Sequence, residues 1–290
     1  MTSAASREQR IVARFVAAVS LLCGAFVQPL GAQADTSRIP SLFTYRDVVL
    51  AGGFAAATLL IRPLDEDYAH RLQDSSTQDS RRLHQLAQFV RTTTAPGSYI
   101  IGTSMYLAGR LTRNDRLATL GLRGSEALVL GEAVGGVLKG FVGRQRPVVA
   151  PRNSHSYQLL RGFTDGDNYQ SFPSGHTVAA FAAAAAVTSE TAQWWPNTRW
   201  LIGSVLYGGA ALTGASRMYD NRHWASDVIV GAAIGTFAGL KVVRYHGSHP
   251  GSLVDRWFLR GSLVPADAGG YTLHWAVAPG AELAAPPRSR

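Results

Sequence analysis

Three short blocks of the sequence, at residues 139–147, 173–176 and 216–227, carry side chains that could bind a phosphate group and attack it. Between them they hold a lysine, several arginines, two histidines and a glycine flanked by polar residues. Converging cations neutralise a tetrahedral dianion, and an imidazole can act as a nucleophile or as a proton donor. We therefore expect the three blocks to fold together into one phosphate pocket.

The first block supplies two cations. Lys139 and Arg146 are seven residues apart, which is two helical turns, so on one continuous helix both would project from the same face. Arginine can also clamp a phosphate with two parallel hydrogen bonds. Taken alone, such a pair more often lies on a solvated helix face. The first block therefore indicates a phosphate site only together with the other two blocks.

The second block has the form of a helix start. Pro173 and Ser174 precede a helix whose first turn would hold Gly175 and His176. Such an N-terminus offers free backbone N–H groups to an anion, and glycine lets the anion come close. Ser174 could cap the helix or bond a phosphate oxygen, and His176 could protonate a leaving oxygen. The competing interpretation is an ordinary capped helix with an exposed histidine.

The third block pairs a histidine with a carboxylate. His223 and Asp227 are one helical turn apart, so the carboxylate is expected to bond one ring nitrogen and strengthen the other as a nucleophile. Arg217 adds a guanidinium for the developing charge. A surface pair at this spacing would contribute only a few tenths of a kcal/mol. The presence of all three blocks in order favours the pocket.

Apolar and amphipathic runs predict helices that would position these blocks. We expect an all-α bundle, with a loop at 147–172 and a small β-hairpin at 262–277. The amphipathic helix is predicted from Leu83, Leu86, Phe89 and Val90. The expected helices cover 48–61, the amphipathic part of 64–94, 97–111, 118–146, 174–191, 200–215 and 223–244.

Residues 1–34 have the pattern of an export signal, with three arginines, a short apolar run at 15–27 and Ala32-Gln33-Ala34 at the cleavage position. A membrane anchor is the alternative, but the apolar run has about 13 residues where roughly 20 would span a bilayer. We predict a helical domain at 35–250 and a tail at 251–290. The single cysteine, Cys23, would leave with the signal, so no disulfide or thiolate metal site is expected.

Charge and hydropathy limit the partners and the location. The net charge of +9 favours an anionic substrate or a membrane surface, and no basic reading motif indicates nucleic acid. The apolar runs span about 10–16 residues, as is usual for buried core helices. Charges such as Arg123 and Glu132 are unfavourable in lipid, and the mean hydropathy is only +0.02. We expect a periplasmic body, soluble or surface-associated, with an integral inner-membrane protein as the alternative.

Read together, the blocks resemble the type 2 phosphatidic acid phosphatase (PAP2) superfamily, which also takes in bacterial acid phosphatases, undecaprenyl-diphosphate phosphatases and vanadium haloperoxidases. The family pattern is Lys-x6-Arg-Pro, then Pro-Ser-Gly-His, then Ser-Arg-x5-His-x3-Asp. The resemblance covers about residues 48–244. Every specified position is met, at Lys139, Arg146, Pro147, Pro173, Ser174, Gly175, His176, Ser216, Arg217, His223 and Asp227.

The resemblance implies an all-α bundle and a role for each motif residue. His223 would be the nucleophile that forms a phosphohistidine, Asp227 its partner, and His176 the general acid and then the base. No metal or cofactor is expected. The phosphate oxygens would be held by Lys139, Arg146, Ser174, Gly175 and Arg217.

The predicted function is a metal-independent phosphatase for phosphate monoesters or diphosphates, including those of lipids. A vanadate-dependent haloperoxidase and a non-catalytic phosphate- or lipid-binding protein are the alternatives. Soluble esters, phosphatidic acid, isoprenoid diphosphates and lipid A phosphates all remain open as substrates. The remaining cations and histidine of this region, Arg144, Arg152, Arg161 and His155, are expected to be solvated surface residues.

Overall fold

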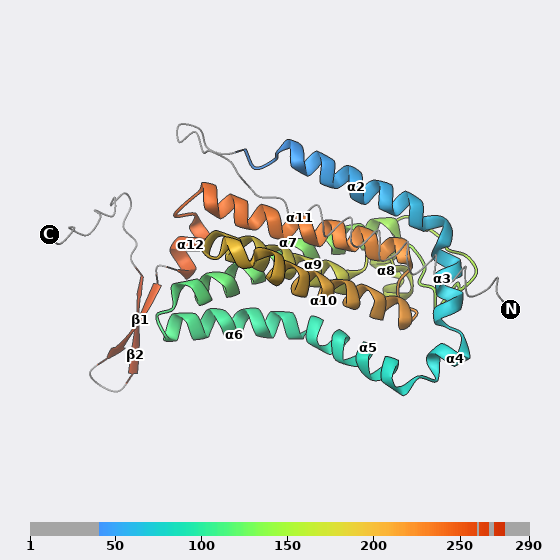
Figure 1. Ribbon diagram of the computed structural model, residues 1–290, viewed down its shortest axis with the longest axis horizontal. Helices are drawn as coiled ribbons and strands as arrows, with labels where there is room; N and C mark the ends of the chain where they lie inside the picture. Colours follow the sequence, from blue (N-terminus) through green and yellow to red (C-terminus); the bar gives the residue numbers. More distant parts are fainter. Residues whose placement is uncertain (1–40, 260, 267–269, 276–290) are drawn as a thin grey trace.

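The computed structural model describes residues 41–259, 261–266 and 270–275. Its long helices run side by side along one axis, and short helices and loops gather at one end (Figure 1). The all-α bundle predicted from the sequence is confirmed for residues 41–259. The predicted export signal at 1–34 lies outside the described residues, as does the end of the tail.

The helices follow one another with short connections, except for the long connection at residues 143–160 between α7 and α8. The N-terminal half contains α2 (Tyr45–Ile61), η1 (Arg62–Leu64), α3 (Asp65–Leu72), α4 (Ser75–Gln78), α5 (Arg81–Thr94), α6 (Gly97–Leu111) and α7 (Asp115–Val142). The C-terminal half contains α8 (Arg161–Thr164), η2 (Gly166–Tyr169), α9 (Gly175–Trp194), η3 (Pro196–Thr198), α10 (Arg199–Tyr219), α11 (Ala225–Ser248) and α12 (Leu253–Phe258).

Two strands follow α12. β1 (Gly261–Ala266) pairs antiparallel with β2 (Gly270–Trp275). The residues that would connect them, 267–269, are outside the described part of the chain. The hairpin as a whole therefore stays a prediction.

Helix α9 lies at the centre of the bundle and packs against α7, α10 and α11. Its alanine-rich sequence makes this possible, because small side chains let neighbouring backbones approach closely. Ala182 and Ala185 are fully buried, and a side chain at Gly235 of α11 would come within 2.2 Å of the Val178 carbonyl oxygen. This close contact holds the first half of α9 against the middle of α11.

The end of α7 differs from the prediction. The helix stops at Val142, because Gly143 adopts a left-handed conformation with φ of 56° and its N–H bonds the Lys139 carbonyl. A side chain at Gly143 would meet the Gln158 carbonyl oxygen at 1.8 Å. Lys139 is therefore in the helix and Arg146 is beyond it, so the predicted arrangement on one helix face is wrong.

The start of α11 also differs from the prediction. Trp224 is extended, with ψ of 158°, and the Asp227 carboxylate accepts its backbone N–H at 2.9 Å. The helix therefore begins at Ala225 and leaves His223 in the preceding turn. His223 and Asp227 do not face each other across one helical turn, which changes the role that the carboxylate can have.

The helices that contain the apolar runs of 10–16 residues are longer than those runs: α9 has 20 residues, α10 has 21 and α11 has 24. By length and composition, two helical segments could cross a membrane, the continuous segment 45–72 and α11. Most of α11 is buried in the bundle, whereas the segment 45–72 is largely exposed. The length argument for a soluble body therefore does not apply to these helices.

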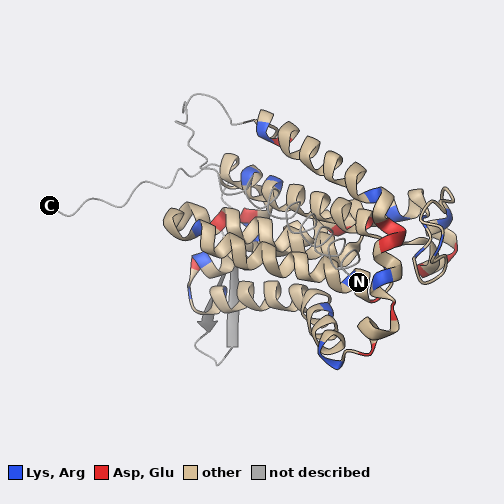
Figure 2. Ribbon diagram, turned by 45° about the vertical axis from the view of Figure 1, so that its right-hand side comes forward, with Lys and Arg blue, Asp and Glu red and all other residues tan. Residues whose placement is uncertain are grey.

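Large apolar side chains cover much of the outside of the bundle. Lys, Arg, Asp and Glu lie mainly at its two ends, and the helices between them carry few charges (Figure 2). Helix α5 is amphipathic as predicted, but its apolar face points outward, since Leu83, Leu86 and Phe89 are exposed while Ala87 is buried. The exposed apolar residues between the ends include Leu59, Leu60, Ile100, Ile101, Val134, Val137, Trp200 and Val205.

Candidate active site

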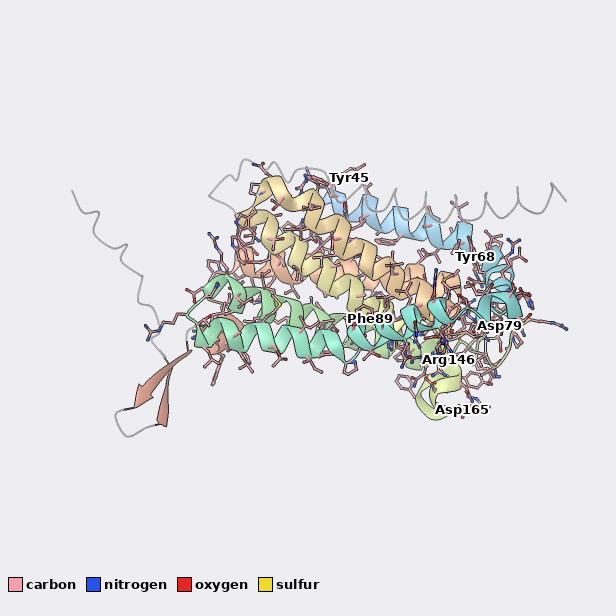
Figure 3. All side chains as sticks on the ribbon, turned by 60° about the horizontal axis from the view of Figure 1, so that its bottom comes forward. Tyr45, Tyr68, Asp79, Phe89, Arg146 and Asp165 are labelled. Atoms are coloured by element: carbon pink, nitrogen blue, oxygen red, sulfur yellow. The ribbon has the colours of Figure 1, made fainter. Side chains whose placement is uncertain are left out.

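The three sequence blocks meet at one end of the bundle. The C-terminal ends of α7 and α10 and the N-terminal ends of α9 and α11 carry them, together with the loop between α7 and α9. Figure 3 shows Arg146 at this end, close to the loop that carries Asp165. The motifs thus lie at one of the two charged ends of the bundle.

Lys139 and Arg146 are both held by backbone carbonyls. Lys139 Nζ donates to the carbonyl oxygens of Gln170 at 3.1 Å and Pro173 at 2.6 Å. Arg146 is 7% exposed and donates to the carbonyl oxygens of Asp167 and Arg222 at 2.6 and 3.1 Å. Burial, followed by the charge of Arg146, lowers the pKa of Lys139 to about 8. The two cations therefore share a confined space.

Arg217 is the third buried cation. Its Nη1 donates to Asp220 at 2.8 Å, and its Nε is buried without a hydrogen-bond partner among the described residues. Burial, together with the charge of Arg146 and against that of Asp220, lowers the pKa of Arg217 to about 10. A free donor in a positively charged space has the chemistry to bind an anion oxygen.

The ring of His223 is fixed by a backbone carbonyl. It is 4% exposed, and its Nδ1 lies 2.6 Å from the Ser171 carbonyl oxygen, which can only accept, so Nδ1 carries the proton. The other nitrogen, Nε2, is then unprotonated and accepts a long hydrogen bond from Arg146 Nη1 at 3.5 Å. Burial holds the pKa of His223 well below its usual value. The positive charges of Lys139, Arg146 and Arg217 act in the same direction.

Asp227 does not bond the His223 ring, which corrects the expectation from sequence. The carboxylate accepts from Ser171 Oγ at 2.6 Å, from the Trp224 N–H at 2.9 Å and from Arg144 Nη1 at 2.5 Å. The tautomer-fixing contact therefore comes from the carbonyl of Ser171. The Asp227 carboxylate accepts a hydrogen bond from the Ser171 hydroxyl. Asp227 therefore acts on the His223 ring indirectly, through Ser171.

Arg144 is also placed differently from the prediction. It is 1% exposed rather than a solvated surface residue. Beyond its contact with Asp227, it donates to Asp65, Ser226 and the Ser154 carbonyl. Gly143 explains the burial, because the chain turns inward after the helix ends. His155, by contrast, is exposed as predicted.

The second block forms the start of α9. Ser174 is its N-cap residue, but its hydroxyl accepts from Thr177 Oγ1 at 2.8 Å instead of capping the helix. The Ser174 N–H donates to the Asp227 carbonyl oxygen at 3.1 Å, which ties α9 to α11. Gly175 faces the Lys139 side chain, since an added Cβ would lie 3.5 Å from Lys139 Cε.

His176 is half-buried beside the same cations as His223. Its pKa is lowered to about 4. Burial is the largest cause, and the charges of Arg217, Lys139 and Arg146 come next. These three cations also lower the pKa of His223. The structure thus brings both histidines into the field of one cationic cluster.

Several residues of the site have no signal in the sequence. Ser171 precedes the second block and is recognised only from its contacts. Asp167 bonds Arg146 from the loop, and Glu132 lies 3.3 Å from the position of an added Gly175 Cβ. Burial raises the pKa of Glu132, which the charge of Lys139 partly offsets. Among the described residues, no group of three or more His, Cys, Asp or Glu is placed to hold a metal ion.

Comparisons with known proteins agree with the motifs. Residues 122–249 match the PAP2 superfamily. An 88-residue stretch is 44% identical to a lipid A 1-phosphatase of Porphyromonas gingivalis, and it makes up 30% of this chain and 19% of that protein. The chain thus spans about a fifth of the length of that curated relative.

A solved structure has a similar fold. It is a transmembrane PAP2-type phosphatidylglycerolphosphate phosphatase of Bacillus subtilis, 20% identical, with a TM-score of 0.50 over 72% of this chain and 100% of that chain. At this identity the likeness concerns the fold alone. The family match begins within α7 and contains all three motifs. Over residues 122–249, the chain is similar to the PAP2 superfamily.

Proposed function

We propose that this protein is a metal-independent phosphatase that hydrolyses phosphate monoesters or diphosphates through a phosphohistidine on His223. The observation that carries the proposal is the protonation and orientation of the His223 imidazole. Nδ1 donates to the Ser171 carbonyl, and the unprotonated Nε2 accepts from Arg146 inside the cationic cluster. A neutral imidazole aimed at an anion site has the geometry of a nucleophile.

In the first step, Nε2 attacks phosphorus and the bond to the leaving oxygen breaks. Arg146, Arg217 and Lys139 neutralise the charge on the phosphoryl oxygens, together with the N–H groups at the start of α9. His176 gives its proton to the leaving oxygen. A bound dianion offsets the cations that lower the pKa of His176, so the ring gains this proton when substrate binds.

In the second step, His176 takes a proton from water and the resulting hydroxide attacks the phosphohistidine. The N–P bond breaks, inorganic phosphate leaves, and His223 returns to its neutral form. Two histidines therefore suffice for both proton transfers. The Ser171 carbonyl keeps Nδ1 protonated and supports the positive ring while phosphate is attached.

The substrate class that we propose is a lipid phosphate. Support comes from the exposed apolar residues around the bundle and from the outward apolar face of α5. The relatives named above act on lipid A and on phosphatidylglycerolphosphate. We propose that the bundle is membrane-associated with its motif-bearing end at the surface. The export pattern at residues 1–34 favours the periplasmic side.

Trapping the intermediate tests the mechanism. The protein is mixed with p-nitrophenyl phosphate, whose leaving group needs little protonation, and phosphate on histidine is measured by mass spectrometry after a rapid quench. His223→Ala is expected to form none and to lose turnover. His176→Ala is expected to accumulate the phosphohistidine, because water is no longer activated. His155→Ala, an exposed histidine of the nearby loop, is the control.

Two results would reject the proposal. One is unchanged turnover in His223→Ala, and the other is loss of activity after treatment with a chelator. The substrate class is tested separately by comparing kcat/KM for a lipid phosphate in mixed micelles with that for p-nitrophenyl phosphate. A higher value for the soluble ester would remove the lipid assignment and leave the mechanism in place.

A further inference from the structure

A buried ion cluster lies directly behind the candidate site. Its centre is Arg144, whose guanidinium donates to two carboxylates, Asp227 at 2.5 Å and Asp65 at 2.8 Å. All three side chains are at most 1% exposed. An ion cluster in such a place is seldom a source of stability, because the loss of hydration offsets the attraction of the charges. Its position therefore suggests a role in arranging the site.

Asp65 comes from a distant part of the sequence. It is the first residue of α3, outside residues 122–249 that match the family. Its carboxylate accepts from the Ser226 N–H at 2.8 Å, from Ser226 Oγ at 2.6 Å and from Arg144. These donors belong to the first turn of α11 and to the chain just after α7. Asp65 thus joins the two motif-bearing segments.

The neighbouring residue strengthens this connection. Glu66 accepts from both the N–H and the hydroxyl of Ser154, each at 2.9 Å. The Ser154 carbonyl in turn accepts from Arg144 Nε at 3.0 Å and Nη2 at 2.6 Å. The start of α3 therefore fixes the guanidinium both directly and through the loop.

From Arg144, a continuous series of contacts leads to the nucleophile. Arg144 holds the Asp227 carboxylate, which accepts the Ser171 hydroxyl at 2.6 Å. The carbonyl of Ser171 accepts the Nδ1 proton of His223 at 2.6 Å. Each contact is short and buried, so a shift of the guanidinium would be passed on to the ring.

We propose that Asp65 is a positioning residue for His223, acting through Arg144, Asp227 and Ser171. It sets the orientation of the ring and keeps the proton on Nδ1, so that Nε2 faces the phosphate. The proposal rests on the proposed function, in which Nε2 attacks phosphorus. A displacement of about 1 Å at a reacting group can lower a rate by roughly 100-fold.

The matched pair Asp65→Asn and Asp47→Asn separates positioning from stability. Asp47 is a buried carboxylate of α2 that pairs with Lys241 at 2.7 Å and Arg244 at 3.1 Å, away from the motif residues. Both variants lose one buried charge from the N-terminal helices. Asp65→Asn is expected to lower kcat roughly 10- to 100-fold. The inhibition constant of inorganic phosphate should change less than about threefold, since the phosphate ligands are untouched.

Nitrogen-15 spectra of labelled histidine provide a readout that does not depend on activity. His223, assigned by comparison with His223→Ala, should be an Nδ1–H tautomer in the wild type and in Asp47→Asn. In Asp65→Asn, it should become a mixture of tautomers. Ser226→Ala removes one ligand of the Asp65 carboxylate and serves as a milder variant if Asp65→Asn does not fold. It should change kcat and the spectrum in the same direction.

The outcomes distinguish the two proposals. If the wild-type protein releases no phosphate from any ester, the proposed function fails, and the tautomer of His223 alone decides the role of Asp65. If the wild type is active, equal kcat values for Asp65→Asn and Asp47→Asn would overturn the positioning role. An unchanged His223 spectrum in the folded variant would overturn it as well.

Discussion

The pH dependence of activity should reveal the protonation of Lys139. Its pKa of about 8 means that roughly nine-tenths of the side chain is charged at pH 7 and roughly one-tenth at pH 9. A charge-assisted hydrogen bond to phosphate contributes about 1.5–3 kcal/mol, so the uncharged form should be about 10- to 150-fold slower. We expect kcat/KM to fall about tenfold between pH 7 and pH 9.

Lys139→Arg is the sharpest test, because a guanidinium stays charged across this range. The variant should have a lower kcat/KM at pH 7, since the contacts with the Gln170 and Pro173 carbonyls are remade. Its kcat/KM should nevertheless stay flat to pH 9. The pKa of His223 is lowered, so its ring is neutral in the free enzyme above pH 6.5 and does not cause the decline. The proton that His176 takes up with substrate would add a decline of its own, so the ester in the assay is p-nitrophenyl phosphate, whose leaving group needs little protonation.

The assay follows kcat/KM for a phosphate monoester from pH 6.5 to 9.5, above the second pKa of the ester, which is about 6. Lys241→Arg is the control, since Lys241 is a buried lysine paired with Asp47 outside the site. Its profile should keep the alkaline decline of the wild type. A Lys139→Arg profile that declines at the same pH as the wild type would refute the assignment.

Three further changes test the site and its support. Glu132→Gln should tighten inhibition by inorganic phosphate at pH 7 by roughly tenfold, because it removes a carboxylate beside Gly175; a weaker inhibition would contradict this placement. Asp227→Asn should lower the free energy of unfolding by about 3 kcal/mol in a denaturant titration, since it leaves Arg144 with one carboxylate. Gly143→Ala should cost at least about 1–2 kcal/mol, as its left-handed backbone and the carbonyl 1.8 Å away both oppose a side chain; an unchanged Tm would refute this.

The sequence predicted the helical bundle and the assembly of the motifs, because both depend on local patterns. Alanine-rich and glycine-rich runs are typical of closely packed helices, and α9 and α11 have the predicted character. The cations and histidines have types and spacings that are rare together. Their roles in catalysis stay proposals, which the trapping experiment tests.

The details that were wrong depend on a few backbone angles. The left-handed turn at Gly143 ends α7 before Arg146, and the extended Trp224 starts α11 after His223. Residue spacing could not reveal either, because a helix continued by one turn would place the same residues differently. The burial of Arg144 and the contacts of Ser171 follow from these turns, so they could not be predicted either.

The direction of the α5 apolar face could not be predicted for a different reason. The helical spacing of Leu83, Leu86 and Phe89 indicates a face, but the spacing does not say what covers it. In the structure, α5 packs on α10, where Thr94 and Thr213 share a hydrogen bond, and Ala87 is buried while the larger apolar side chains are exposed. An apolar face normally turns to the core of a soluble protein, so this orientation favours a lipid environment.

The crowding of positive charge at the candidate site has a consequence for turnover. Lys139, Arg146 and Arg217 repel one another until an anion arrives, and orthophosphate, the product of the proposed reaction, relieves that repulsion as well as any substrate. Departure of the product would then be a slow part of the cycle. Phosphate in the medium should also make the folded chain harder to unfold, by about 2.7 kcal/mol at 100 times its dissociation constant.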